Sequence, residues 1–300
     1  MTTPHLTTTG HLGTLPVSRI GFGAMQLAGP GVFGPPADPE RSRAVLRRAV
    51  ELGVDHLDTA QFYGPDVVND LIREALHPYP DHLRLVTKIG AERDEQGAWL
   101  PAGRPEQLVE QVEQNLRSLR VDRMDMVNLR RFDLDAPELD QPALEDQLEV
   151  LVRLRDQGTI AQIGISSVGA EVVQRAVETA GVVSVQNPYS ILDRSGQDSL
   201  EAARELDLAF VPYFPLGSAF TGGPAKIAAE PRLAAVAAKH GARPAQVALA
   251  WLLASYENML LIPGTSSVTH LEENLAVGSI ALDAEDMATL EEVEQAPAGH

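Results

Sequence analysis

The most informative stretch of this sequence reads Gly53-Val54-Asp55-His56-Leu57-Asp58-Thr59-Ala60-Gln61-Phe62-Tyr63-Gly64, and Val86-Thr87-Lys88 follows about 25 residues later. Each piece has the pattern of a β-strand end, because apolar residues give way to polar ones. Asp58, Tyr63 and Lys88 therefore lie at strand ends. An ammonium beside a phenol is expected to lower the pKa of the tyrosine, and an aspartate keeps the ammonium charged. Such a tyrosine can donate a proton near neutral pH.

Outward from this stretch, short apolar runs alternate with longer amphipathic ones. Strands are predicted at 18–23, 54–58, 83–88, 125–129, 160–165, 182–186, 209–213 and 259–262. Helices are predicted near 39–52, 66–76, 105–120, 141–157, 170–179, 197–206, 243–256 and 267–276. Strands that alternate with helices pair in parallel, so the eight units predict one closed (β/α)₈ barrel, a TIM barrel, as a single domain over residues 1–300.

Two additions to the barrel are expected. Residues 6–9 and 12–15 have the pattern of an N-terminal hairpin that turns at Gly10-His11 and plugs the barrel floor. Asp283 has the position of an N-cap for an extra C-terminal helix that ends before Pro297.

Composition limits the possible functions. The 300 residues include 42 acidic and 24 basic side chains, a formal charge of −18, which argues against nucleic acid or an anionic membrane as partner. The absence of cysteine excludes disulfides and thiolate metal sites. Residues 1–10 lack the apolar core of a secretory signal, and no run is long enough to span a membrane, so a cytoplasmic location is expected. The oligomeric state is not indicated.

Residues that carry chemistry gather where the predicted strands end, which is where a closed barrel has its active site. Each has an ordinary structural explanation when taken alone, such as a cap for Asp58 or a solvated strand end for Lys88. Together these explanations become improbable. In chain order the strand ends hold Gly23-Ala24-Met25, Asp58 with Tyr63, Lys88, Asn128 to Arg131, Ser166-Ser167, Gln186-Asn187, Tyr213 to Gly217, and Ile262 to Thr265.

The arrangement resembles that of the aldo-keto reductases, over most of the chain from Ser18 to Asn274. Asp58, Tyr63 and Lys88 match the catalytic positions of that family. The resemblance implies a nicotinamide cofactor, a small-molecule carbonyl substrate, and hydride transfer to the carbonyl carbon while Tyr63 protonates the oxygen.

The resemblance also implies a set of cofactor-binding residues. Gln186 and Ser166 would bind the nicotinamide carboxamide, although Ser167 stands where the family usually has Asn, and Tyr213 would stack on the ring. Phe214 to Gly217 match the loop beneath the pyrophosphate. The set comprises Gly23, Ala24, Met25, Asp58, Ser166, Gln186, Tyr213, Phe214, Leu216, Gly217, Gly264, Thr265, Ser266, His270, Glu273 and Asn274.

The segment Ile262 to Asn274 also has a physical interpretation of its own. A Gly-Thr-Ser-Ser run that opens a helix offers N–H groups, hydroxyls and a positive dipole end to a phosphate, although an ordinary N-cap has the same pattern. Thr265, Ser266 and His270 occupy the region that meets the 2′-phosphate in relatives, which favours NADP, with NADPH preferred over NADH. Gly264 and His270 stand where many relatives have Lys and Arg, which weakens that preference.

Arg130 is the main departure from the family pattern, because many relatives have a histidine there. Strand alternation places Met126, Asn128 and Arg130 on one face, which directs Arg130 toward Lys88. Its fixed charge can hold a carbonyl oxygen and favour the phenolate of Tyr63. A salt bridge at the barrel rim is the alternative.

Three further features are interpreted as structural. His56 shares strand parity with Asp58 and is expected to be a buried core histidine. No metal-binding motif accompanies it, so no metal is predicted. Residues 29–34 match G-x-G-x-x-G, but Pro30, Pro35 and Pro36 prevent the helix that a dinucleotide-binding fingerprint requires, so this loop is expected to wall the substrate pocket.

Within the family, the sequence looks closest to bacterial pyridoxal reductase-like members, which makes reduction of pyridoxal to pyridoxine the leading substrate hypothesis. Trp99 either lines the pocket or anchors its loop. Two other functions stay open. One is a nicotinamide-binding sensor or accessory protein with little turnover, suggested by Arg130. The other is a barrel isomerase or lyase for phosphorylated sugars, which leaves Tyr213 and Gln186 without a role.

Overall fold

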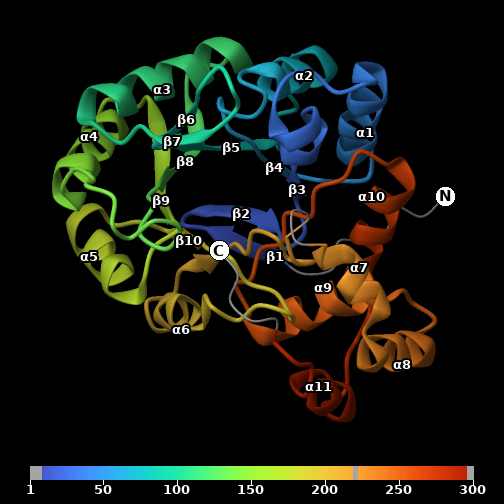
Figure 1. Cartoon of the computed structure of the whole chain (residues 1–300). Coiled ribbons are helices and arrows are strands. Elements are labelled where there is room, and N and C mark those ends of the chain that lie inside the picture. The colour runs from blue at the N-terminus through green and yellow to red at the C-terminus, as the bar shows by residue number, and fades with distance from the viewer. Residues whose placement is uncertain (1–8, 219–221, 296–300) are drawn as a thin grey trace.

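Seven parallel strands form a curled sheet in the order β11-β10-β9-β8-β5-β4-β3. The computed structural model describes residues 9–218 and 222–295. Figure 1 looks along the barrel that the sheet forms, with helices around it. The strands are β3 (Phe22–Gly23), β4 (His56–Asp58), β5 (Arg84–Ile89), β8 (Met124–Arg130), β9 (Ile160–Ser166), β10 (Ser184–Gln186) and β11 (Ala209–Phe210).

The predicted eighth strand closes the barrel through single bridges. Met259 pairs with Phe210 of β11, and Leu261 pairs with Ile20 just before β3, both in parallel. The Leu260 amide donates to the Phe210 oxygen over 2.9 Å, and the Gly21 amide donates to the Leu261 oxygen over 2.8 Å. The predicted (β/α)₈ barrel is therefore confirmed, although its last strand is reduced to these contacts.

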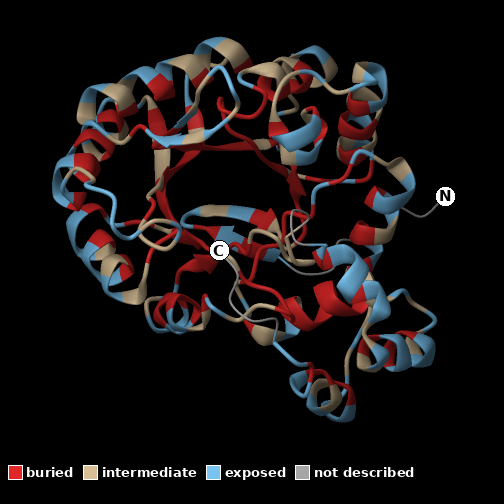
Figure 2. Cartoon of the chain, in the orientation of Figure 1, coloured by how far each residue is buried: buried red, intermediate tan, exposed pale blue. Residues whose placement is uncertain are grey.

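The helices cover the outside of the sheet and bury their apolar faces against it (Figures 1 and 2). The eight predicted helices are present, but the fourth begins at Leu144 instead of 141, because Pro142 disfavours the helical conformation of Gln141 before it. Helices α7 and α8 were not predicted. The helices are α1 (Pro39–Glu51), α2 (Val67–Leu76), α3 (Pro105–Leu119), α4 (Leu144–Asp156), α5 (Ala170–Ala180), α6 (Gln197–Glu205), α7 (Gly223–Ala229), α8 (Pro231–His240), α9 (Pro244–Ser255), α10 (Val268–Leu275) and α11 (Ala284–Glu291).

An antiparallel hairpin of β1 (Thr9–Leu12) and β2 (Leu15–Ser18) lies across the barrel opening (Figure 1). The expected hairpin exists, but its turn lies at Gly13-Thr14 instead of Gly10-His11, because Gly13 adopts a φ of +59°. Residues 6–8 of the predicted first arm lie outside the described residues. Leu12 and Val17 pack inside the barrel with Met126, as a floor plug should.

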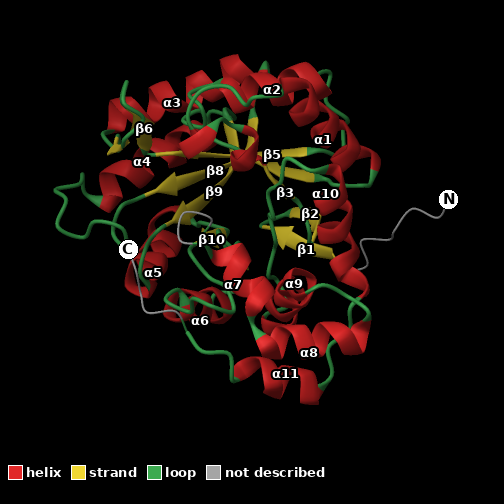
Figure 3. Cartoon of the chain, turned by 45° about the vertical axis from the view of Figure 1, so that its right-hand side comes forward, coloured by secondary structure: helices red, strands yellow, loops and turns green. Residues whose placement is uncertain are grey.

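Two further elements complete the fold, which Figure 3 shows after a turn of 45° from the view of Figure 1. β6 (Ala91–Arg93) and β7 (Trp99–Pro101) form a second hairpin after β5, which was not predicted. Asp283 caps the C-terminal helix α11 as predicted, since its carboxylate accepts the amides of Glu285 and Asp286 over 3.0 and 2.9 Å. Across the described residues, no helix is both long and apolar enough to cross a membrane.

Candidate active site

A buried ion pair joins the ends of β4 and β5. Lys88 donates through Nζ to Oδ1 of Asp58, and also to the backbone oxygen of Thr59 over 3.3 Å. The two charged side chains are only 7% and 6% exposed. Burial by itself lowers the pKa of Lys88, but Asp58 and Tyr63 together more than offset this effect, so the pKa of Lys88 is raised. The ammonium therefore stays charged at neutral pH.

Tyr63 lies beside this ion pair, in the turn between β4 and α2. The Lys88 Nζ is 5.1 Å from the centroid of the Tyr63 ring, and the residue is only 5% exposed. The expectation of a lowered pKa for this phenol is wrong. Burial raises the pKa of Tyr63, and the charges of Lys88 and Arg130 lower it by less. Tyr63 therefore holds its proton at neutral pH, as a proton donor must.

Arg130 ends β8 and forms the rim salt bridge that was the alternative interpretation of this residue. Its Nη2 donates to Oδ2 of Asp135 over 2.6 Å, which is the rim salt bridge. Its guanidinium carbon also lies 4.2 Å from the centroid of the Phe132 ring. Its Nη1 is buried and has no hydrogen-bond partner among the described residues, and its charge acts on the pKa of Tyr63. The second nitrogen is thus free to donate to a bound ligand.

Gln186 and Ser166 are paired in register at the ends of β10 and β9. The Gln186 Nε2 donates to Oδ2 of Asp58 over 3.0 Å. Its Oε1 is buried and finds no donor within the described parts of the chain. A buried acceptor of this kind is costly unless a ligand or water supplies a donor. Gln186 therefore has the free oxygen that a carboxamide N–H requires.

Tyr213 follows β11 and shares a hydrogen bond with Ser167, with 3.1 Å between the two hydroxyl oxygens. The Tyr213 and Phe214 rings meet edge to face at 5.3 Å between centroids. Burial raises the pKa of Tyr213, so its phenol stays neutral. Gly217 ends a turn by donating to the Phe214 oxygen over 2.8 Å, and Leu216 packs against the core.

The predicted phosphate segment opens α10. Ser267 is the N-cap, since its Oγ accepts the His270 amide over 3.4 Å, and Thr265 Oγ1 accepts the Ser267 amide over 3.1 Å. Glu273 pairs with Arg243 over 3.0 Å, and Asn274 is 8% exposed. The N-cap interpretation is therefore correct for Ser267, while Ser266 and His270 are left exposed.

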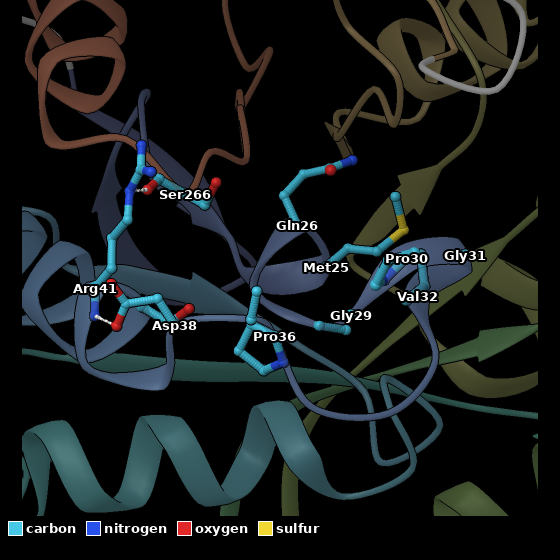
Figure 4. Close-up of a pocket in the computed structure, with 13 residues that line it drawn as sticks. Met25, Gln26, Gly29, Pro30, Gly31, Val32, Pro36, Asp38, Arg41 and Ser266 are labelled. Carbon is cyan, nitrogen blue, oxygen red and sulfur yellow. Dashed lines mark hydrogen bonds between the residues drawn. The ribbon is translucent and has the colours of Figure 1, made fainter.

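The segments after β3 and after the eighth strand approach each other through their backbones. A Cβ on Gly264 would lie 2.6 Å from the Gly23 oxygen, and a Cβ on Gly23 would lie 2.4 Å from the Ile262 oxygen. The two glycines therefore bring the start of the η1 turn (Ala24–Leu27) beside Ser266. These neighbours line a pocket of about 480 Å³, shown in Figure 4, with the 29–32 part of the glycine- and proline-rich loop and the start of α1. No helix follows Gly34 directly, as expected.

His56 is buried inside the barrel, as predicted. Its Nδ1 lies 3.1 Å from Oδ1 of Asp55, and a Cβ on Gly21 would lie 2.2 Å from its Nε2. Across residues 9–218 and 222–295, no group of three or more His, Asp or Glu side chains is placed to hold a metal ion.

Sequence reasoning missed two contributors to the surroundings of the site. Arg93 lies 4.1 Å from the Trp99 ring centroid and 5.4 Å from that of Phe33, so Trp99 anchors the β6–β7 hairpin, and it also packs edge to face on Phe62. Arg41 on α1 lines the pocket beside Ser266.

The sequence profile of the aldo/keto reductase family matches residues 19–295. The chain therefore belongs to the aldo/keto reductase family and is an oxidoreductase of that type. It is 49% identical over 280 residues to pyridoxine 4-dehydrogenase from Escherichia coli. The aligned region covers 93% of this chain and 96% of that protein.

Solved structures share the fold. A thermostable aldo-keto reductase in complex with the inhibitor epalrestat is 27% identical, with a TM-score of 0.78 over 95% of this chain and 99% of that one. An aldo/keto reductase from Klebsiella pneumoniae in complex with NADP and acetate is 23% identical, with a TM-score of 0.77 over 94% of this chain and 93% of that one.

Proposed function

We propose that this protein reduces a small aldehyde or ketone with NADPH, that pyridoxal is its leading substrate, and that Tyr63 donates the proton. The observation that carries the proposal is the buried Lys88–Asp58 pair beside a protonated Tyr63. The E. coli relative is named pyridoxine 4-dehydrogenase, and dehydrogenation of that alcohol is the reverse of reducing its aldehyde. The K. pneumoniae structure contains NADP.

The residues present fit a nicotinamide cofactor. The Gln186 Oε1 is a buried acceptor without a donor in the described residues, which suits the carboxamide. Ser166 and Tyr213 would complete the nicotinamide end, Phe214 to Gly217 would lie at the pyrophosphate, and the Gly264 to Asn274 segment would hold the adenosine phosphate. The reduced cofactor, when bound, supplies a hydride.

The chain's own residues manage the proton. Tyr63 gives its hydroxyl proton to the oxygen of the carbonyl as that oxygen becomes an alkoxide, which yields the alcohol. The phenolate left on Tyr63 is stabilised by the charge of Lys88, and Asp58 keeps Lys88 charged. The free Nη1 of Arg130 would donate to the substrate oxygen and stabilise its developing charge. In the reverse direction the phenolate removes the alcohol proton.

The test is to mix the purified protein with NADPH, or separately NADH, and to add pyridoxal or one of a panel of simple aldehydes and ketones. Loss of the reduced-nicotinamide absorbance follows the reaction, and chromatography identifies the product. We expect turnover with NADPH and formation of pyridoxine from pyridoxal. If the protein reduces the simple aldehydes or ketones but not pyridoxal, pyridoxal is not its substrate, and the proposed type of reaction still stands.

A nicotinamide-binding sensor is the second candidate, because Arg130 replaces the histidine that many relatives have and is held by Asp135. Tight binding of NADPH without turnover of any carbonyl in the panel would favour the sensor. Failure to bind either nucleotide would contradict both candidates.

A further inference from the structure

The segment expected to meet the 2′-phosphate of the cofactor carries no Lys or Arg of its own. From Gly264 to His270 it offers hydroxyls, backbone amides and one exposed histidine. A dianionic phosphate on a chain of formal charge −18 needs a nearby cation to offset repulsion. That cation has to come from another part of the fold.

Arg41 lies beside this segment. Its Nε donates to the backbone oxygen of Ser266 over 2.7 Å, from 225 residues away in the chain. Figure 4 shows Arg41 and Ser266 together at one end of the pocket, with Met25 and Pro30 at the other. The bond to Ser266 fixes the guanidinium at the opening of α10 and leaves its two terminal nitrogens for a ligand.

Arg41 differs from the other arginines of α1 in its partners. Arg43 pairs with Glu40 and Glu74, Arg47 with Glu40, and Arg48 with Glu51 and Glu272. Arg41 has no ion pair with any residue in the described ranges. Asp38 also lines the pocket, but its Oδ1 accepts the backbone amide of Arg41 and so caps the helix.

We propose that Arg41 binds the 2′-phosphate of NADPH, together with the hydroxyl and amide groups of Ser266, and thereby selects NADPH over NADH. The inference rests on the proposed function, because it assumes that a nicotinamide dinucleotide occupies the site. Guanidinium forms two parallel hydrogen bonds with a phosphate. Arg41 supplies, from a different helix, the permanent positive charge of a Lys or Arg that the segment from Gly264 to His270 lacks.

The experiment compares cofactor binding by the wild type, Arg41→Ala and Arg43→Ala. Arg43 is the matched control, since it lies on the same helix, carries the same charge and pairs with Glu74 on α2 instead. NADPH and NADH are titrated while tryptophan fluorescence is followed, and adenosine 2′,5′-bisphosphate and adenosine 5′-monophosphate are titrated by calorimetry.

Arg41→Ala should weaken the binding of NADPH and of adenosine 2′,5′-bisphosphate by about tenfold or more, as expected for loss of a hydrogen bond between charged groups. NADH and the monophosphate should bind as before, and Arg43→Ala should change none of the four. Unchanged NADPH affinity in Arg41→Ala, or an equal loss for NADH, would overturn the role of Arg41 while the proposed function stands. A wild type that binds neither dinucleotide would instead overturn the proposed function.

Discussion

Gln186 donates a hydrogen bond of 3.0 Å to Asp58, although 128 residues separate them in the chain. The same carboxylate accepts from Lys88 through its other oxygen. Asp58 therefore connects the amide expected to hold the nicotinamide with the cation beside Tyr63. A shift of Gln186 or of Lys88 would move the other through Asp58. The position of the proposed cofactor and the surroundings of Tyr63 therefore depend on one buried hydrogen-bond network.

Replacing Tyr63 by phenylalanine tests the proton donor. Tyr63→Phe should lower the rate of carbonyl reduction by about 100-fold or more, since general acid catalysis contributes about that much. The ring and its packing on Phe62 remain, so NADPH affinity should change little. Single-turnover rates and fluorescence titration measure the two quantities. Undiminished turnover would remove Tyr63 from its assigned role.

The pH dependence follows from the raised pKa of Tyr63. Reduction needs the protonated phenol, so its rate should be flat through neutral pH and fall only as the pH rises through that raised pKa. Oxidation of the alcohol needs the phenolate and should speed up over the same rise in pH. Pre-steady-state rates in both directions check this sign. A reduction rate that falls between pH 6 and 7, roughly the range in which histidine titrates, would contradict it.

Changing Arg130 to histidine tests the departure from the family pattern. Arg130→His should keep measurable reduction, because Lys88 remains beside Tyr63. The pH profile should gain a titration near neutral pH, where histidine loses its charge and guanidinium does not. Asp135→Asn is the companion variant, since it removes only the rim partner of Arg130. An identical pH profile and substrate range would make Arg130 a rim residue.

Asp286 should make stability depend on acid. Burial alone raises the pKa of Asp286, but bonds of 2.7 Å from Lys239 and His240 offset this and lower it to about 2 from 3.8. The stabilisation by the charged Asp286 is fully present when the pH is above the pKa that this carboxyl has in the unfolded chain. It is lost as the pH falls through the lower pKa of the folded protein. Asp286→Asn should cost about 2 kcal/mol of unfolding free energy at neutral pH and nothing below about pH 2.

Denaturant unfolding at neutral pH and at low pH measures this difference. Glu285→Gln is the control, because Glu285 is the exposed neighbour of Asp286 on the same helix. Equal destabilisation of Asp286→Asn at both pH values would show a loss of packing instead of a lost charge interaction.

Much of the site was predictable from local sequence. Asp58, Lys88 and Gln186 each lie at the end of an apolar run, and the parallel strands of a closed barrel bring such ends to the same face. The pKa of Tyr63 was not predictable, because its direction depends on burial by residues distant in the chain. Arg41 was missed for the same reason, since its partner Ser266 is 225 residues away.

The fold was predictable where the hydrophobic period was strong. Helix α8 was missed because its buried face is made by Leu233, Val236 and Ala237 only, amid small alanines that give little periodic contrast. The N-terminal turn was misplaced because Gly10 and Gly13 both suit a turn. The register was decided by Leu12 and Val17, which must both reach the barrel interior.

The β1–β2 hairpin has a kinetic consequence. Because Leu12 and Val17 fill the end of the barrel where the strands begin, the part of the chain that the structure describes leads us to expect that small molecules reach Tyr63 from the other end. The proposed nicotinamide cofactor and carbonyl substrate would then share one entrance, and the one that binds deeper would bind first and leave last. Steady-state inhibition by the products should accordingly follow a compulsory order of addition, with the nucleotide and the alcohol leaving in a fixed sequence.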